Sequence, residues 1–209
     1  VDDVTNNKVI FDSATGELIP EFTSSKEYSG NYDAGNSFNT SVDGNVLTVN
    51  HARSTAVKGN IRDDIGADYW LFPATSEDRT ITADITIKSL DTGTDKQGIA
   101  IGQFNAKTGS AMKSDIIHFQ KNKVAQHTYS TTAGSGNSGD PKSSIETDVT
   151  YTISYAKKGS EVYVTLKDAT GATLIDNQVI DLANDYEDLL AGKEVRYGFA
   201  FTGVVADIS

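Results

Sequence analysis

The stretch RTITADITIK, residues 79–88, decides the fold class because apolar and polar side chains alternate along its whole length. Such alternation is typical of a β-strand that buries one face and exposes the other. We expect the polar face to carry threonine and aspartate. The side chains expected to point inward are Ile81, Ala83, Ile85 and Ile87.

The same alternation continues toward the C-terminus. Residues 161–167 place Val162, Val164 and Leu166 on one face. Residues 194–202 alternate Val195, Tyr197, Phe199 and Phe201 with Arg196, Gly198 and Ala200. Residues 98–104 are apolar or small on both faces, which is typical of a central strand covered on both sides. Gly-bearing segments at 157–160 and 169–172 predict hairpin connections.

Strands that recur about every 8–12 residues predict an all-β sandwich or barrel. Residues 184–191, NDYEDLLA, are the one segment that indicates a helical turn or two. No linker divides the chain, so we expect a single domain over residues 1–209. The Gly/Ser-rich segment 131–144 is predicted to be a long surface loop between strands.

Composition limits the function classes. The 209 residues carry 18 basic and 29 acidic side chains, and a net charge of −11 argues against a general nucleic-acid binder. No apolar run is long enough to span a membrane. The absence of cysteine excludes disulfides and thiol chemistry. The start VDDV lacks the features of a signal peptide, which is compatible with a processed secreted protein or an excised module.

The sequence of the second half resembles that of a known family. YTISYA at 151–156, EVYVTLKD at 161–168, GATLID at 171–176 and the ending YGFAFTGVVADI at 197–208 are similar to concanavalin-like or laminin-G-like jelly rolls appended to bacterial polysaccharide lyases and glycosidases. The resemblance covers about residues 46–208. It implies a two-sheet antiparallel sandwich, an extracellular location, attachment to a larger multidomain enzyme, and binding of a polysaccharide such as a plant cell-wall chain.

Signatures of catalysis are incomplete. The paired-carboxylate strand of the related glucanases and the serine-hydrolase elbow are both absent. IIH at 116–118 and YAKKG at 155–159 echo fragments of jelly-roll polysaccharide lyases, but the partnering arginine strand is missing. We therefore expect a non-catalytic, monomeric carbohydrate-binding module. A divergent polysaccharide lyase and a cell-surface adhesion domain are the alternatives.

The strongest local signal is DIIHFQKNKVAQHTY, residues 115–129, which predicts two strands joined by a tight turn at 121–123. A two-residue loop pairs His118 with either Ala125 or His127, and both registers put the two histidines on one face. Gln120, Ala125 and Tyr129 share that face. Ile117, Phe119 and Val124 are expected to point the other way, into the core.

Imidazole, amide and phenol groups side by side suit sugar recognition, which needs flat apolar surface and fixed hydrogen-bonding groups. Residues 105–142 hold five lysines against two aspartates, which favours an acidic glycan such as pectin. The predicted ligand-binding residues are His118, Gln120, His127 and Tyr129, with Lys121, Lys123, Arg53 and Trp70 in second rank. The alternative is structural: lysines in a turn, histidines at a sheet edge, Arg53 as a surface charge, and Trp70 beside Phe72 in the core.

Metal binding has little support. His118 and His127 would supply only two ligands, with no carboxylate nearby. Calcium often joins the first and last strands of such sandwiches, and Asp12 and Asp207 are the candidates, but no EF-hand spacing accompanies them. We predict no metal and no cofactor, and leave a structural calcium open.

Overall fold

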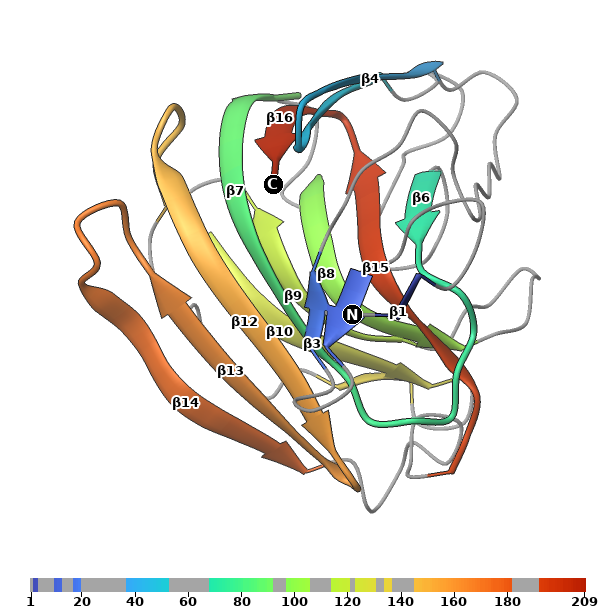
Figure 1. Ribbon diagram of the computed structural model, residues 1–209. Coiled ribbons are helices and arrows are strands. Elements are labelled where there is room, and N and C mark those ends of the chain that lie inside the picture. Colours follow the sequence, from blue (N-terminus) through green and yellow to red (C-terminus); the bar gives the residue numbers. More distant parts are fainter. Residues whose placement is uncertain are drawn as a thin grey trace.

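The computed structural model describes residues 2–3, 10–12, 17–19, 37–52, 68–91, 97–105, 114–120, 123–130, 134–136, 145–181 and 192–209. Within these ranges every regular element is a β-strand, and the strands form two sheets that face each other (Figure 1). No helix in the described part of the chain is long and apolar enough to cross a membrane. The helical turn predicted at 184–191 lies outside the described residues.

Ten strands form the first sheet. The order β1–β2–β3–β7–β12–β13–β14 runs across it, while β16 pairs with β5 and β7, and β4 pairs with β5. All pairs are antiparallel except β3 with β7. The strands are β1 (Asp2–Asp3), β2 (Ile10–Asp12), β3 (Glu17–Ile19), β4 (Ser37–Asp43), β5 (Val46–Ala52), β7 (Thr80–Leu90), β12 (Thr150–Lys158), β13 (Glu161–Lys167), β14 (Thr173–Asp181) and β16 (Val204–Ile208).

Six antiparallel strands form the second sheet, in the order β11–β10–β9–β8–β15–β6. They are β6 (Asp68–Leu71), β8 (Gly98–Asn105), β9 (Ser114–Gln120), β10 (Lys123–Ser130), β11 (Gly134–Gly136) and β15 (Val195–Thr202). The strand β11 corrects the prediction that residues 131–144 form a long surface loop. Its Gly134–Gly136 backbone pairs with the end of β10, so the segment continues the sheet there.

The main core fills the space between the sheets. The predicted inward faces of β7, β13 and β15 are confirmed, since each residue expected to point inward is at most 3% exposed. Alternation explains this because each strand presents one apolar side to the opposite sheet. The core members from these strands are Ile81, Ala83, Ile85, Ile87, Val162, Val164, Leu166, Val195, Tyr197, Phe199 and Phe201.

The six-stranded sheet is also buried on its other side. A second cluster consists of Tyr69, Leu71, Ala100, Phe104, Ile116 and Ala200. Ile99 and Ile101 of β8 enter the main core while Ala100 and Phe104 enter this cluster, which confirms the prediction that β8 is covered on both faces. The chain is thus an all-β sandwich, as predicted.

Candidate functional site

The hairpin of β9 and β10 has one of the two registers expected from the sequence. Ala125 pairs with His118, and Gln120 pairs with Lys123 across a two-residue connection. The backbone therefore places positions 118, 120, 127 and 129 on one face, which is the outer face of the six-stranded sheet. Lys121, and the side chains of Lys123, His127 and Tyr129, lie outside the described residues, so their part in ligand binding stays a prediction.

His118 and Gln120 do not lie on an open surface. Their side chains are 0% and 4% exposed, and the Gln120 amide Nε2 donates a hydrogen bond of 3.0 Å to His118 Nδ1. Ile116 on the same face is buried in the second cluster, and Ala100 lies opposite His118. The prediction that these two residues face ligand directly is wrong. The physical reason is that this sheet buries both of its faces.

Trp70 lies between the sheets. It is 3% exposed, and its ring meets Phe72 edge to face at a centroid distance of 5.1 Å. Both belong to the main core. The prediction that Trp70 is a stacking platform for sugar is therefore wrong, and the structural alternative is confirmed. Arg53 lies outside the described residues.

The two lyase-like fragments do not converge on one site. Tyr155 of β12 points into the space between the sheets, where its hydroxyl donates hydrogen bonds to Asp115 Oδ2 and, at 3.1 Å, to the Asp115 carbonyl. His118 occupies the opposite face of the strand that carries Asp115, because residues three apart in a strand point to opposite sides. The six-stranded sheet thus separates Tyr155 from His118.

A cluster of polar side chains is buried around Tyr155. Asp115, Gln103 and Tyr155 are fully buried, and Lys157 is 2% exposed. Burial, followed by the nearby Asp115 carboxylate, raises the pKa of Tyr155 well above its usual value. Burial also lowers the pKa of Lys157, although the carboxylates of Asp78 and Asp115 oppose that shift. These contacts join the two sheets inside the sandwich, and sequence reasoning missed them.

A second buried polar contact joins the sheets near β16. His51 of β5 and Asp68 of β6 are both buried, with His51 Nε2 at 2.8 Å from Asp68 Oδ2. The backbone N–H of Gly203 donates to His51 Nδ1 at 2.9 Å. His51 must therefore carry its proton on Nε2 and donate it to Asp68. The role of this contact is structural.

The calcium candidates are not brought together by any described contact. Asp207 Oδ1 accepts a hydrogen bond of 2.8 Å from the Thr48 hydroxyl. Asp12 belongs to β2, and its side chain lies outside the described residues. No group of three metal-ligating side chains is found among the described residues. The prediction of no bound metal, with a structural calcium as the alternative, stays a prediction.

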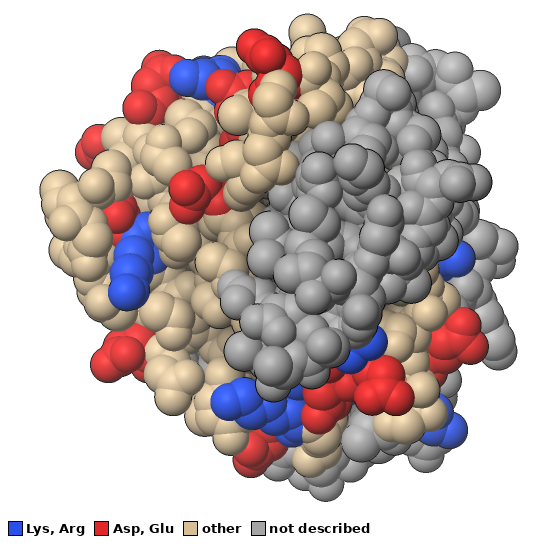
Figure 2. Space-filling model, viewed as in Figure 1, with Lys and Arg blue, Asp and Glu red and all other residues tan. Residues whose placement is uncertain are grey.

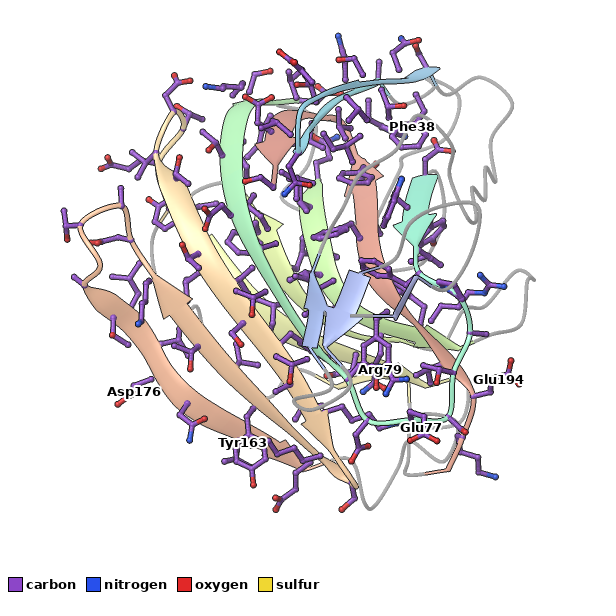
Figure 3. The ribbon with its side chains drawn as sticks, in the orientation of Figure 1. Phe38, Glu77, Arg79, Tyr163, Asp176 and Glu194 are labelled. Atoms are coloured by element: carbon purple, nitrogen blue, oxygen red, sulfur yellow. The ribbon has the colours of Figure 1, made fainter. Side chains whose placement is uncertain are left out.

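The exposed face with mixed chemistry is the outer side of the ten-stranded sheet, toward the viewer in Figure 2, where uncharged residues cover much of the described surface. Across β12, β13 and β14, the pairing aligns Ala156 with Tyr163 and Tyr163 with Val179. We call these three residues the β12–β14 strip. Figure 3 shows Tyr163 on the outside of the sheet.

Two charged side chains border Tyr163. Its hydroxyl donates a hydrogen bond of 2.6 Å to Glu161 Oε2, and Lys158 Nζ lies 5.0 Å from the centre of its ring. The Glu161 contact is the main cause of a raised Tyr163 pKa. Sequence reasoning missed this site, although the alternation within 161–167 already places Tyr163 on the outward face.

Solved structures of other proteins are similar to this chain. No family model and no curated protein sequence matches the chain. Carbohydrate-binding module CBM66 from Bacillus subtilis is similar at 14% identity and a TM-score of 0.51, covering 84% of this chain and 92% of that one. Alginate lyase A1-II′ is similar at 14% identity and a TM-score of 0.50, covering 87% and 81%. At this identity the likeness concerns the fold alone. The chain has the concanavalin-like β-sandwich fold.

Proposed function

We propose that this chain is a non-catalytic carbohydrate-binding module. The observation that carries the proposal is a sheet face that presents threonine hydroxyl groups on β7 and β12 and an aromatic ring, Tyr163, on β13. Sugars are recognised by this combination, because the ring meets their C–H faces while fixed polar groups meet their hydroxyls. The fold adds support, since it is shared with a protein described as a carbohydrate-binding module.

Side-chain hydrogen bonds hold the hydroxyl groups of this face in place. The Thr86 and Thr150 hydroxyls lie 2.7 Å apart, and the Thr152 hydroxyl donates to Asp84 Oδ1 at 2.5 Å. A hydroxyl oxygen has two lone pairs and one proton, so each group keeps capacity for a further hydrogen bond. A face ordered in this way loses little conformational entropy when a ligand binds.

Separation of the lyase-like fragments supports the non-catalytic part of the proposal. A lyase needs a base and a charge-neutralising group within reach of one sugar ring. Tyr155 and His118 lie on opposite sides of the six-stranded sheet and cannot meet the same ring. A polysaccharide lyase that uses other residues, and an adhesion domain that binds protein, are the competing functions.

The setting is part of the same proposal. We place the module outside the cell, as a monomeric part of a larger enzyme that it anchors to a polysaccharide such as a plant cell-wall chain. A preference for acidic, pectic chains, which Lys121 and Lys123 suggest in the sequence, is the alternative to a neutral ligand. The measurements below separate this preference from polysaccharide binding in general.

Affinity gel electrophoresis of the intact chain tests the proposal. Gels containing neutral glucan, xylan, mannan or fructan, and gels containing pectate or alginate, are compared with a gel lacking polysaccharide. Retardation in at least one polysaccharide gel, with no release of unsaturated uronate ends, is expected. Formation of those ends on pectate or alginate would identify a lyase. Unchanged migration in every gel would overturn polysaccharide binding.

A further inference from the structure

We propose that the β12–β14 strip, with Tyr163 at its centre, is the platform on which a segment of a neutral polysaccharide chain lies. This inference rests on the proposed function and names both the site and the class of ligand. The strip crosses three adjacent strands at the edge of the ten-stranded sheet. Neighbouring strands are about 4.8 Å apart, so the strip is roughly 10 Å long.

The apolar part of the strip is unusual for an exposed sheet face. Val179 is 49% exposed, and among the described residues the other exposed large hydrophobic side chain is Val46. Val179 lies directly opposite Tyr163, so the valine and the ring form one apolar surface. Ala156, on the other side of Tyr163, is 8% exposed, and its small side chain does not protrude above the ring.

Polar groups border the strip on both long sides. Lys158 and Glu161 pair with each other on one side, and Ser154 pairs with Thr165 on the other. A cation near a partly exposed ring such as Tyr163 is bound weakly, so a sugar can replace Lys158 over the ring while the ammonium donates to a hydroxyl. The Glu161 carboxylate offers an acceptor beside it. The strip thus provides stacking at its centre and hydrogen bonds at its margins.

Charge favours a neutral ligand at this site. Among the described residues of β7, β12, β13 and β14, the outward or exposed charged side chains number three basic and three acidic, and they are Lys88, Lys158, Lys167, Asp84, Glu161 and Asp176. A surface without an excess of either sign does not select a charged polymer. The chain as a whole carries −11, which repels a polyanion.

The β14 edge is poorly suited to a protein strand as the partner. Asn177 has a positive φ of 45°, and the β13–β14 register shifts between Val164 and Leu166. Irregularities of this kind hinder the addition of another strand. The face, not the edge, is therefore where the ligand binds.

Single substitutions in the intact chain test the site, using the neutral polysaccharide gels described above. Tyr163→Ala is expected to weaken retardation about tenfold or more, because the stacking surface is lost. Tyr163→Phe, which keeps the ring, is expected to stay within about threefold. Val179→Ser should weaken binding severalfold, whereas Val46→Ser, at the matched exposed valine far from the strip, should not change it.

Melting temperatures of all four variants serve as the folding control. If Tyr163→Ala destabilises the fold, the contrast between Val179→Ser and Val46→Ser decides the question. Unchanged retardation for both Tyr163→Ala and Val179→Ser would overturn the site while leaving polysaccharide binding intact. Retardation by pectate or alginate alone would overturn the neutral ligand. Absence of retardation of the unmodified chain in every gel would overturn the function itself.

Discussion

At the scale of single residues, His51 shows how one buried side chain fixes the relation between the two sheets. It lies on β5 of the ten-stranded sheet, donates to Asp68 of the six-stranded sheet, and accepts the N–H of Gly203 between β15 and β16. Removal of the imidazole would leave Asp68 as a buried carboxylate without that donor. Buried charges that lose their partners are costly.

His51→Ala is therefore expected to lower the free energy of unfolding by about 3–5 kcal/mol. Urea denaturation provides the measurement. Lys88→Ala is the control, because the Lys88 side chain is 44% exposed and its Nζ lies 3.7 Å from Asp148 Oδ1, and exposed ion pairs contribute about 1 kcal/mol or less. Equal losses for the two variants would contradict the structural role of His51.

The buried Tyr155 is expected to make the free energy of unfolding depend on pH in the alkaline range. Burial and Asp115 raise its pKa well above the unfolded value of about 10. Above about pH 10 the unfolded chain has released the tyrosine proton, whereas the folded chain retains it. The free energy of unfolding therefore falls as the pH rises above about 10. Below about pH 10 the stabilisation that Tyr155 contributes is fully present. Lys157, whose pKa is lowered, contributes the opposite slope below its unfolded pKa of about 10.4.

We expect urea unfolding of the unmodified chain to show declining stability above about pH 10, and Tyr155→Phe to show a shallower decline. At neutral pH the variant should be less stable by about 1–3 kcal/mol, because Asp115 loses a buried donor. Parallel pH profiles for the two proteins would show that Tyr155 does not hold its proton through the fold.

At the scale of elements, close strand approach depends on glycine. Gly98 of β8 has a φ of +133°, and a Cβ at this position would lie 1.9 Å from the carbonyl oxygen of Phe119 on β9. The strands could accept a side chain there only by moving apart. Gly171, in the turn between β13 and β14, has a φ of +83° but no atom within 4 Å of such a Cβ.

Gly98→Ala is accordingly expected to cost about 3 kcal/mol or more, because backbone must shift. Gly171→Ala is expected to cost about 1–2 kcal/mol, from backbone conformation alone. Thermal or urea unfolding compares the two. A smaller loss at Gly98 than at Gly171 would be inconsistent with the strand spacing of β8 and β9.

The elements also show what the sequence predicts and what it does not. Alternation predicts strands at 79–88, 161–167 and 194–202, and the structure has them at 80–90, 161–167 and 195–202. The β9–β10 turn allows two registers, and the pairing of His118 with Ala125 is one of them. Alternation assigns residues to the two faces of a strand, but it does not tell whether other parts of the protein bury the polar face. His118 and Gln120 lie on a sheet whose second face is also apolar, and the hydrogen bond between them lowers the cost of their burial.

The same limit explains the site that was missed. Tyr163 is the single aromatic among the outward positions of 161–167, and nothing in its own strand marks it as special. Its neighbours Ala156 and Val179 come from two other strands, and only the pairing of β12, β13 and β14 aligns them. A site built across strands has no signature within one segment.

At the scale of the whole molecule, the effect of salt on binding depends on whether the ligand is charged, because the protein carries a net charge of −11. A neutral polysaccharide held by stacking and hydrogen bonds should bind almost equally at low and high salt, because no long-range charge attraction is screened. We expect retardation in neutral gels to change less than about twofold between 0.05 and 0.5 M sodium chloride. A steep loss with salt would indicate instead an acidic chain bound by lysines.

The central claim is that this sandwich binds a polysaccharide and does not cleave it, and calorimetric titration of the intact chain with a soluble polysaccharide fragment tests it most directly. The fragment comes from the polysaccharide that retards the chain most strongly. We predict a saturable isotherm with a dissociation constant of about 1 μM to 1 mM and no heat after saturation. Absence of any binding heat, or continuous heat from turnover, would contradict the claim.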